Sequence, residues 1–181
     1  MSTHTYTSGG TLGAQASHWT ERDVTNRPVG SSNSRFAVAT FETWGGLQKA
    51  LSELQDKGLT ADTFSCLGLR RLFANKPSTL ADQLCDDHEL EFANNAEAVC
   101  CTRGILADYL LSRLTAGAPT LGSALGHWLI PRHANDIQRA VLAGQIVFWV
   151  QLFDNADERC AYDALLANSS QSVGVHDLVS D

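Results

Sequence analysis

The sequence is poor in basic residues and has no long apolar run. Its thirteen lysine and arginine residues stand against twenty aspartate and glutamate residues, for a net charge of −7. A chain without a basic stripe lacks the charges that release counterions from a nucleic-acid backbone, so we expect no nucleic-acid partner. No apolar segment approaches the roughly 18 to 20 residues that cross a bilayer, and the N-terminus lacks the pattern of a signal peptide. The sequence therefore predicts a cytoplasmic protein with no membrane span.

The common catalytic motifs are also absent. The sequence contains no Gly-x-Ser-x-Gly nucleophile elbow, no phosphate-binding Gly-Lys-Ser/Thr loop and no dinucleotide-binding Gly-x-Gly-x-x-Gly. No nucleophile stands beside a plausible base. This pattern favours a protein that is not an enzyme, and we predict no catalytic residue and no cofactor.

The five cysteines include no Cys-x-x-Cys pair, which excludes a disulfide framework. Cys100 and Cys101 are adjacent, so they point to different sides of a helix or a strand and are poor joint ligands for one zinc ion. Free cysteine is a common small core residue. We therefore expect core positions for Cys66, Cys85, Cys100, Cys101 and Cys160.

Residues 1–34 predict a flexible N-terminal arm. They contain sixteen serine, threonine and glycine residues and only scattered apolar ones, so they bury too little surface to offset the entropy of ordering. Trp19 is the one residue that could anchor the arm, which makes this segment a candidate contact for a protein partner. The whole chain of 181 residues is 44% hydrophobic, which is enough for one ordinary core. We expect residues 35–181 to form a single domain.

The first part of this domain has the pattern of a strand, a helix and a second strand. Residues 36–41 are rich in strand-forming side chains, and Thr43 can cap a helix whose apolar residues recur at helical spacing. Gly58 ends that helix, and residues 63–69 are the second strand.

The same order returns near the C-terminus. Residues 146–153 carry the strongest strand signal in the chain, Asp154 or Asn155 can cap a helix, and residues 173–178 are a final short strand. This degenerate repeat predicts an α+β fold, in which two βαβ halves form a ferredoxin-like four-stranded antiparallel sheet with two helices on one face.

A helical insert is expected between the halves, over about residues 78–143. Thr79 with Asp82 can open one helix, and Asn95 can cap a longer one that ends at Gly117. Further helix boundaries are indicated by Pro119, Pro131 and Gly144.

Residues 121–126 form a small-residue segment with the spacing G-x-x-x-G, which in a chain without a membrane span indicates close helix packing. A Pro-initiated helix, a strand, an acidic turn, a helix and a last strand ending at Leu178 follow it. Together with residues 35–69, this order resembles the bacterial general-stress and heat-induced stress protein family, whose members pair two βαβ halves around a Gly-rich middle. The resemblance implies the fold, and it brings no established reaction and no catalytic residue. Related chains often have a middle apolar enough to meet a membrane, whereas polar residues interrupt it here: Asp108, Arg113, His127 and Arg132.

The most polar cluster lies at residues 82–91 and contains no lysine or arginine. Its carboxylates suit a hard divalent cation, and Cys85 and His88 would share one face of a helix, as a borderline metal requires. The candidate metal ligands are Cys85, Asp86, Asp87 and His88. The spacing matches no calcium loop, and charge runs usually face water, so a solvated acidic surface is the favoured interpretation.

His127 and His133 flank Pro131, beside Trp128. A cofactor or metal pocket lined by these histidines and Trp149 is one interpretation, but two histidines without a third ligand are weak evidence, and packing at a helix end is favoured. His176 and Asp177 are neighbours on the last predicted strand, so they point to opposite faces and do not form a dyad.

The strand over residues 146–153 is apolar on both faces. The two helices of a ferredoxin-like sheet cover only one face, so the other must meet the helical insert or another subunit. If a subunit supplies the cover, the interface includes Val147, Phe148, Trp149 and Phe153.

These patterns predict a non-enzymatic protein that acts as a stress-associated or scaffold-type interaction module and forms a homo-oligomer. The alternative is a small-molecule or cofactor-binding protein, or an enzyme of the dimeric α+β barrel type, with a pocket between the sheet and the helical insert.

Overall fold

The computed structural model describes residues 33–84, 86–170 and 173–179. The predicted arm over residues 1–34 lies outside these residues, apart from Asn33 and Ser34, with which the first strand β1 (Asn33–Phe41) begins. In the described part of the chain, no helix is both long and apolar enough to cross a bilayer.

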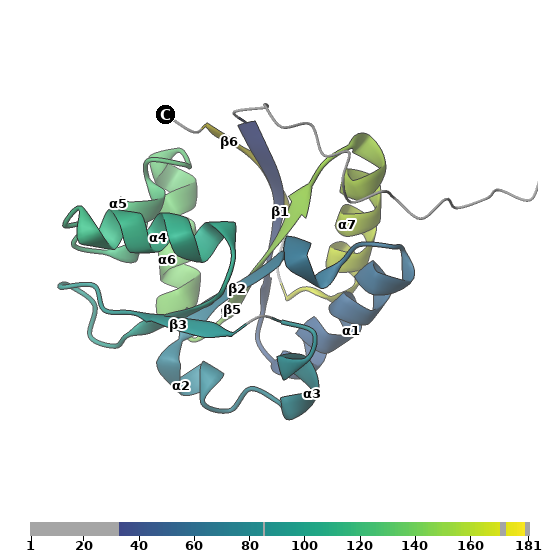
Figure 1. Ribbon diagram of the computed structural model, residues 1–181, viewed down its shortest axis with the longest axis horizontal. Coiled ribbons are helices and arrows are strands. Elements are labelled where there is room, and N and C mark those ends of the chain that lie inside the picture. The colour runs from purple at the N-terminus through teal and green to yellow at the C-terminus, as the bar shows by residue number, and fades with distance from the viewer. Residues whose placement is uncertain (1–32, 85, 171–172, 180–181) are drawn as a thin grey trace, which may run out of the picture. The chain divides into compact units, whose positions relative to one another are not determined.

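The fold is α+β, and its sheet has six antiparallel strands in the order β3–β4–β2–β5–β1–β6 (Figure 1). The four predicted strands are β1, β2, β5 and β6. The sheet has two strands more than the predicted four, because β3 and β4 form a hairpin beside β2. The bounds of the later strands are β2 (Phe64–Leu69), β3 (Asp87–Leu90), β4 (Val99–Thr102), β5 (Ile146–Leu152) and β6 (Gly174–Val179).

Helices α1 (Trp44–Asp56) and α7 (Asn155–Asn168) connect the strands of the two halves and pack against each other. Thr43 caps α1 by accepting a hydrogen bond from a first-turn N–H at 3.2 Å, and Asp154 caps α7 in the same way at 2.8 Å. Gly58, with a φ of 90°, follows the end of α1 in the left-handed conformation that favours glycine. Both predicted helix starts are confirmed.

The prediction of a helical insert over about residues 78–143 is wrong at residues 87–90 and 99–102, which form strands, whereas a helix at residues 78–81 agrees with the one predicted to open near Thr79. Asn95 does not cap a helix; it lies in the loop of the β3–β4 hairpin, and α4 begins ten residues later at Ile105. Residues 99–102 pair with β2 and β3, since the edge of β2 supplies backbone partners that a local helical pattern does not reveal. The remaining helices are α2 (Arg70–Phe73), α3 (Ser78–Ala81), α4 (Ile105–Thr115), α5 (Leu121–Leu125), α6 (Pro131–Leu142) and the short 3₁₀ helix η2 (Ala61–Thr63).

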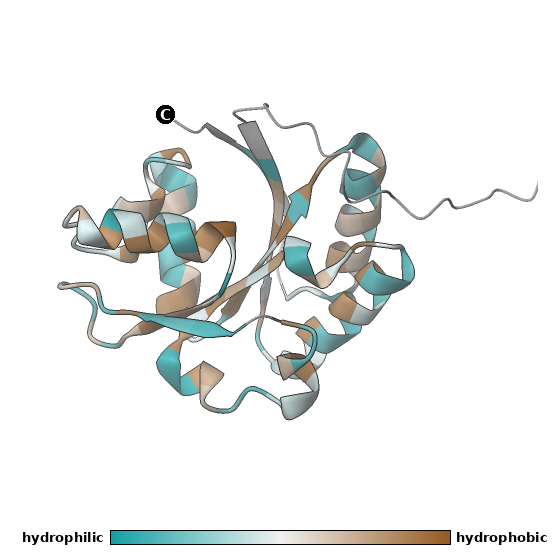
Figure 2. Cartoon of the chain, viewed as in Figure 1, coloured by the Kyte–Doolittle hydropathy of each residue, from teal (hydrophilic) through white to brown (hydrophobic). Residues whose placement is uncertain are grey.

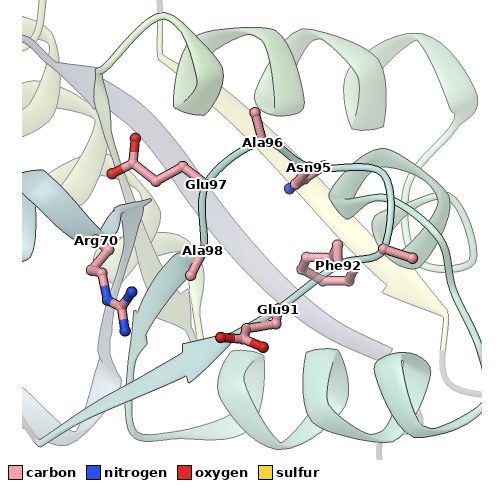
Figure 3. Close-up of a pocket in the computed structure, with 8 residues that line it drawn as sticks. Arg70, Glu91, Phe92, Asn95, Ala96, Glu97 and Ala98 are labelled. Atoms are coloured by element: carbon pink, nitrogen blue, oxygen red, sulfur yellow. The ribbon is translucent and has the colours of Figure 1, made fainter.

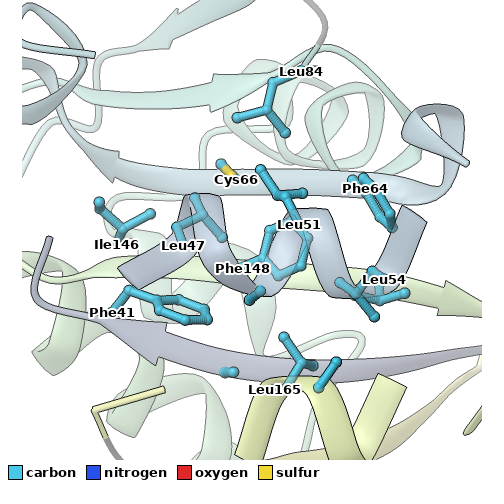
Figure 4. Packing of buried hydrophobic residues seen from close by; sticks show 14 of the residues in the cluster. Phe41, Leu47, Leu51, Leu54, Phe64, Cys66, Leu84, Ile146, Phe148 and Leu165 are labelled. Atoms are coloured by element: carbon cyan, nitrogen blue, oxygen red, sulfur yellow. The ribbon is translucent and has the colours of Figure 1, made fainter. Parts of the chain in front are cut away.

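Two hydrophobic cores lie on opposite faces of the sheet. One face packs against α1 and α7, where Phe148 lies between Phe41, Phe64 and Leu51 (Figure 4). The other face packs against α4, α5 and α6, which lie on the opposite side of the sheet from α1 and α7 (Figure 1). Figure 2 shows the resulting pattern: the central strands are largely apolar, and the edge strand β3 is hydrophilic.

The helical insert covers the second apolar face of β5. Trp149 has an exposed fraction of 0% and meets Phe36 edge to face, with ring centroids 6.0 Å apart. Val147 and Phe148 are equally buried, whereas Phe153 is 47% exposed. Three of the four predicted interface residues are therefore core residues of a single chain. The face that two subunits of a dimeric α+β barrel would share is occupied by the chain's own helices.

The G-x-x-x-G segment serves close helix packing, as its spacing predicts. Gly122 lies in α5 against α6, where an added Cβ would stand 2.9 Å from Oε1 of Gln138. The Gly122 N–H also donates to that oxygen at 2.6 Å. A side chain at position 122 would therefore displace the Gln138 side chain from this contact between α5 and α6.

Candidate functional site

An open cleft of about 730 Å³ lies between α6 and the β1–β6 end of the sheet. Helix α6 packs across β2 and β5, so it leaves this end of the insert-facing surface uncovered. The cleft floor is formed by Val38 and Thr40 of β1 with Gly174 and His176 of β6. Strand pairing sets this floor, since Val38 lies opposite Gly174 and alternate residues share a face.

Two histidines meet in this cleft. His133 lies in the first turn of α6 and His176 lies on β6, and their rings stand edge to face with centroids 4.8 Å apart. The His176 ring folds back over Gly174, where an added Cβ would be 2.8 Å from its Nε2 atom. The imidazole can lie on the floor of the cleft because residue 174 is a glycine and has no side chain there.

The charged side chains of the cleft are mainly basic. Arg132, Asp136 and Arg139 line its helical wall, and Arg139 donates to Asp136 at 3.1 Å. Within the described residues, Arg132 has no ion-pair or hydrogen-bond partner. The first turn of α6 carries no acidic residue, and a helix N-terminus bears partial positive charge. The cleft is thus a positive site on a chain whose net charge is −7.

Burial lowers the pKa of His176, and the neighbouring His133 lowers it further, while Asp177 acts in the opposite direction. Asp177 pairs with Arg35 at 3.2 Å, and Arg35 also reaches Glu158 of α7 at 2.9 Å. Asp177 thus serves an ion-pair network with α7, and the sequence-based exclusion of a His176–Asp177 dyad agrees with this arrangement.

A buried hydroxyl completes the polar lining. The Oγ1 atom of Thr40 is buried and has no hydrogen-bond partner in the part of the chain that the structure describes. Unpaired buried polar atoms are uncommon in folded proteins, because each costs about 1–3 kcal/mol of desolvation. Thr40 and Gln145 therefore place hydrogen-bonding capacity at the end of the cleft away from the histidines.

The sequence-predicted cofactor candidates separate in the structure. His133 lines the cleft, His127 is exposed outside it, and Trp149 lies in the closed core without lining it. The partner of His133 is His176, which the sequence analysis did not connect with it. The packing of α6 against the sheet brings these two residues together, and no local spacing in the sequence predicts this contact.

The acidic cluster does not form the predicted helical metal site. Residues 87–90 are the edge strand β3, so the spacing of Cys85 and His88 no longer places them on one helical face, and Cys85 lies outside the described residues. Asp87 pairs with Lys76 at 2.7 Å, and the side chain of Asp86 lies 3.9 Å from Arg103. Over residues 33–84, 86–170 and 173–179, no group of three His, Cys, Asp or Glu side chains could hold a metal ion. The carboxylates of β3 are surface groups with basic partners from other elements.

A second, smaller pocket of about 480 Å³ lies at the loop of the β3–β4 hairpin (Figure 3). Its basic residue, Arg70, is held by Glu89 at 2.6 Å, and Glu97 is held by Arg71. Asn95 contributes a buried Nδ2 atom without a partner among the described residues. Arg70 and Glu97 are paired, and the remaining charged side chain of the lining, Glu91, is acidic, so this pocket offers an anion less than the α6–β6 cleft does.

The buried cysteines are core residues, as the sequence predicts. Cys100 packs in the core under α1 and Cys101 in the core under the insert, so the adjacent thiols do point to opposite faces. Burial raises the pKa of Cys66, Cys100 and Cys101. Burial therefore favours the protonated form of these three thiols.

The histidine pair makes a prediction about pH. Because the pKa of His176 is lowered in the folded chain, the unfolded chain takes up this proton first as the pH falls through the ordinary histidine value of about 6.5. We expect the free energy of unfolding to fall between about pH 7.5 and pH 5.5, and His176→Gln to flatten this fall. Urea unfolding at several pH values measures it, with the exposed His127→Gln as the matched control. Equal pH slopes for His176→Gln and the unaltered chain would contradict the prediction.

Comparison of the chain with protein-family models, with curated proteins and with solved structures finds no match. The function therefore has to be argued from the cleft.

Proposed function

We propose that this chain is a binding protein for a small anion, which it holds in the cleft between α6 and β6. The observation that carries the proposal is the gathering of Arg132, Arg139, His133 and His176 around one cleft of an acidic chain. This is the second of the two functions that the sequence leaves open, with the pocket between sheet and insert and without a catalytic step.

Electrostatics supports an anion as the ligand. Repulsion by a net charge of −7 would keep anions away from most of the surface, so a local basic cleft supplies selectivity as well as attraction. Arg132 is exposed and, among the described residues, unpaired, so binding need not first break an ion pair. Arginine also suits carboxylate and phosphate groups, because its planar fork donates two parallel hydrogen bonds.

The lining also supports an organic ligand. Val38, Ile137 and Ala140 place apolar surface beside the charged groups. Small-molecule sites typically combine such surface with a few polar groups that fix orientation. An anion with a short carbon skeleton would use both parts of the cleft.

Self-association has less support than the sequence gives it, since Val147, Phe148 and Trp149 are buried within one chain. The resemblance to the general-stress family remains a proposal about the fold and supplies no ligand.

We also propose that strands β2, β5, β1 and β6 form a ferredoxin-like core together with α1 and α7. The β3–β4 hairpin and the helical insert are then additions to this core, and the strand order supports this view.

Titration calorimetry of the full chain with sodium sulfate and sodium acetate tests the proposal. We expect at least one of these anions to bind near neutral pH, and Arg132→Gln to weaken binding by about tenfold or more, as the loss of a charged hydrogen bond predicts. Arg159→Gln is the matched control, because Arg159 is an exposed arginine of α7, on the other face of the sheet.

Equal loss of binding in both arginine variants would mean that the anion responds to net charge alone. That result, or the absence of binding for both anions, would refute the proposed function.

A further inference from the structure

We propose that the cleft takes the phosphate group of a small organic phosphate monoester, and that the His133–His176 pair binds a proton together with it. This inference rests on the proposed function and narrows its ligand. It depends on four features of the cleft: its charge, its donors, the contact between the two rings and its apolar wall.

The charge of the cleft matches a dianion. Arg139 and Asp136 form an ion pair at 3.1 Å, so they largely neutralise each other. Arg132 then supplies one positive charge, and one protonated imidazole of the His133–His176 pair supplies a second. A phosphate monoester carries nearly two negative charges near neutral pH, whereas a carboxylate carries one.

The donors of the cleft come from two elements. Arg132 and His133 lie in the first turn of α6, and His176 lies on β6. A phosphate monoester has three terminal oxygen atoms and can accept from all three directions, whereas a carboxylate has two in one plane.

The contact between the rings couples the anion to a proton. With centroids 4.8 Å apart, two imidazolium ions would repel each other, and burial also favours the neutral form. A dianion beside both rings would offset these effects and draw a proton onto the pair. By the same linkage, binding strengthens as the pH falls.

The other charged groups near the pair do not supply this coupling. On α6 they are Arg132, Asp136 and Arg139, and the floor contributed by β1 carries the uncharged Thr40. Asp177 of β6 is engaged with Arg35, which also pairs with Glu158 of α7. Histidine is therefore the side-chain type of this cleft that can couple anion binding to a proton near neutral pH.

The volume of the cleft, about 730 Å³, exceeds what an inorganic phosphate fills. Ala140 and Ala143 of α6 extend the apolar lining beyond the polar groups, whereas Ile137, at 7% exposed, belongs mainly to the core. An ester with a carbon skeleton would bury this wall, whereas a free phosphate ion would leave it in water.

Titration calorimetry of the full chain with sodium sulfate measures the proton coupling. Sulfate stays doubly charged throughout this range, so any pH dependence comes from the protein. We expect sulfate to bind about tenfold more tightly near pH 5.5 than near pH 7.5, because one linked proton changes affinity by up to tenfold per pH unit. Titrations in two buffers with different ionisation enthalpies should show an average uptake of about half a proton per bound sulfate over this range, which corresponds to the tenfold change.

Single substitutions assign the effect to the pair. His176→Gln and His133→Gln should each remove the pH dependence of sulfate binding, while Arg132→Gln should weaken binding at both pH values and keep the pH dependence. His127→Gln is the matched control and should behave like the unaltered chain, since His127 is exposed outside the cleft. If thermal melting shows that one histidine variant is unfolded, the other variant and the two-buffer titration carry the test.

Phenyl phosphate and inorganic phosphate, compared at one pH, test the ester. We expect phenyl phosphate to bind more tightly, and Ala140→Ser to reduce this advantage. Sulfate affinity that is independent of pH, acetate binding as tight as sulfate binding, or a zinc ion that binds the histidine pair while sulfate does not would each overturn the inference. In the first two outcomes the anion-binding function would still stand, whereas failure of every anion at every pH would refute both.

Discussion

Trp149→Ala should lower the free energy of unfolding by about 3–5 kcal/mol and leave the oligomeric state unchanged. The indole has an exposed fraction of 0%, and its core is formed by Phe36 of the sheet and by helices of the insert from the same chain. Truncation therefore opens a cavity inside one chain, between the sheet and the insert. Urea unfolding measures the loss, and sedimentation of both proteins at equal concentration measures the association state.

Trp149→Phe is the matched control for this variant. The indole N–H has no hydrogen-bond partner among the described residues, so removing it leaves no acceptor unpaired there. Since an aromatic ring still fills most of the space, we expect a loss of about 1.5 kcal/mol or less. A Trp149→Ala chain of unchanged stability but altered sedimentation would instead show that another subunit covers this face.

Phe148→Ala should also cost about 3–5 kcal/mol, through the opposite core. Phe148 forms an aromatic cluster with Phe41 and Phe64 under α1 (Figure 4). Its ring centroid lies 6.3 Å from that of Phe41 and 5.5 Å from that of Phe64. Losing this ring removes contacts between the two halves of the fold, because Phe148 lies on β5 whereas Phe41 ends β1 and Phe64 begins β2. Chemical unfolding followed by far-ultraviolet circular dichroism measures the loss.

Phe153→Ala provides the comparison, because Phe153 follows the same strand and is 47% exposed. We expect its truncation to cost less than about 1 kcal/mol, as for most surface substitutions. Equal losses at positions 148 and 153 would mean that the α1–α7 core is not the main source of stability on that face.

The sequence predicts the two βαβ halves well, because their signals are local. Thr43 and Asp154 cap the helices that their positions predict, and residues 146–152 form the strand with the strongest apolar pattern. The two additional strands of the sheet, β3 and β4, were not predictable in this way. Residues 99–102 are strand only through pairing with β2, a partner that is distant in sequence and leaves no periodic mark.

The candidate site was only partly predictable, for the same reason. His133 is a candidate from the sequence because of its place at a helix start, but its partner His176 lies on another element. Their meeting depends on where α6 crosses the sheet, and the pairing of β1 with β6 then sets which residues form the floor. One feature of the sequence does point to the position of the His176 ring: a glycine two residues before a histidine on the same strand leaves room for the ring to fold back.

The pairing of β1 has a consequence for how the chain acquires its structure during synthesis. Val38 pairs on one side with Trp149 and on the other with Gly174, so both strands that neighbour β1 are synthesised long after it. Until β5 is synthesised, the strand that lies between β1 and β2 is missing, and part of the apolar surface of β1 and β2 stays exposed. Folds dominated by such distant pairings form slowly and expose aggregation-prone surface on the way. Nascent chains that end before β5 are therefore the species most in need of a chaperone.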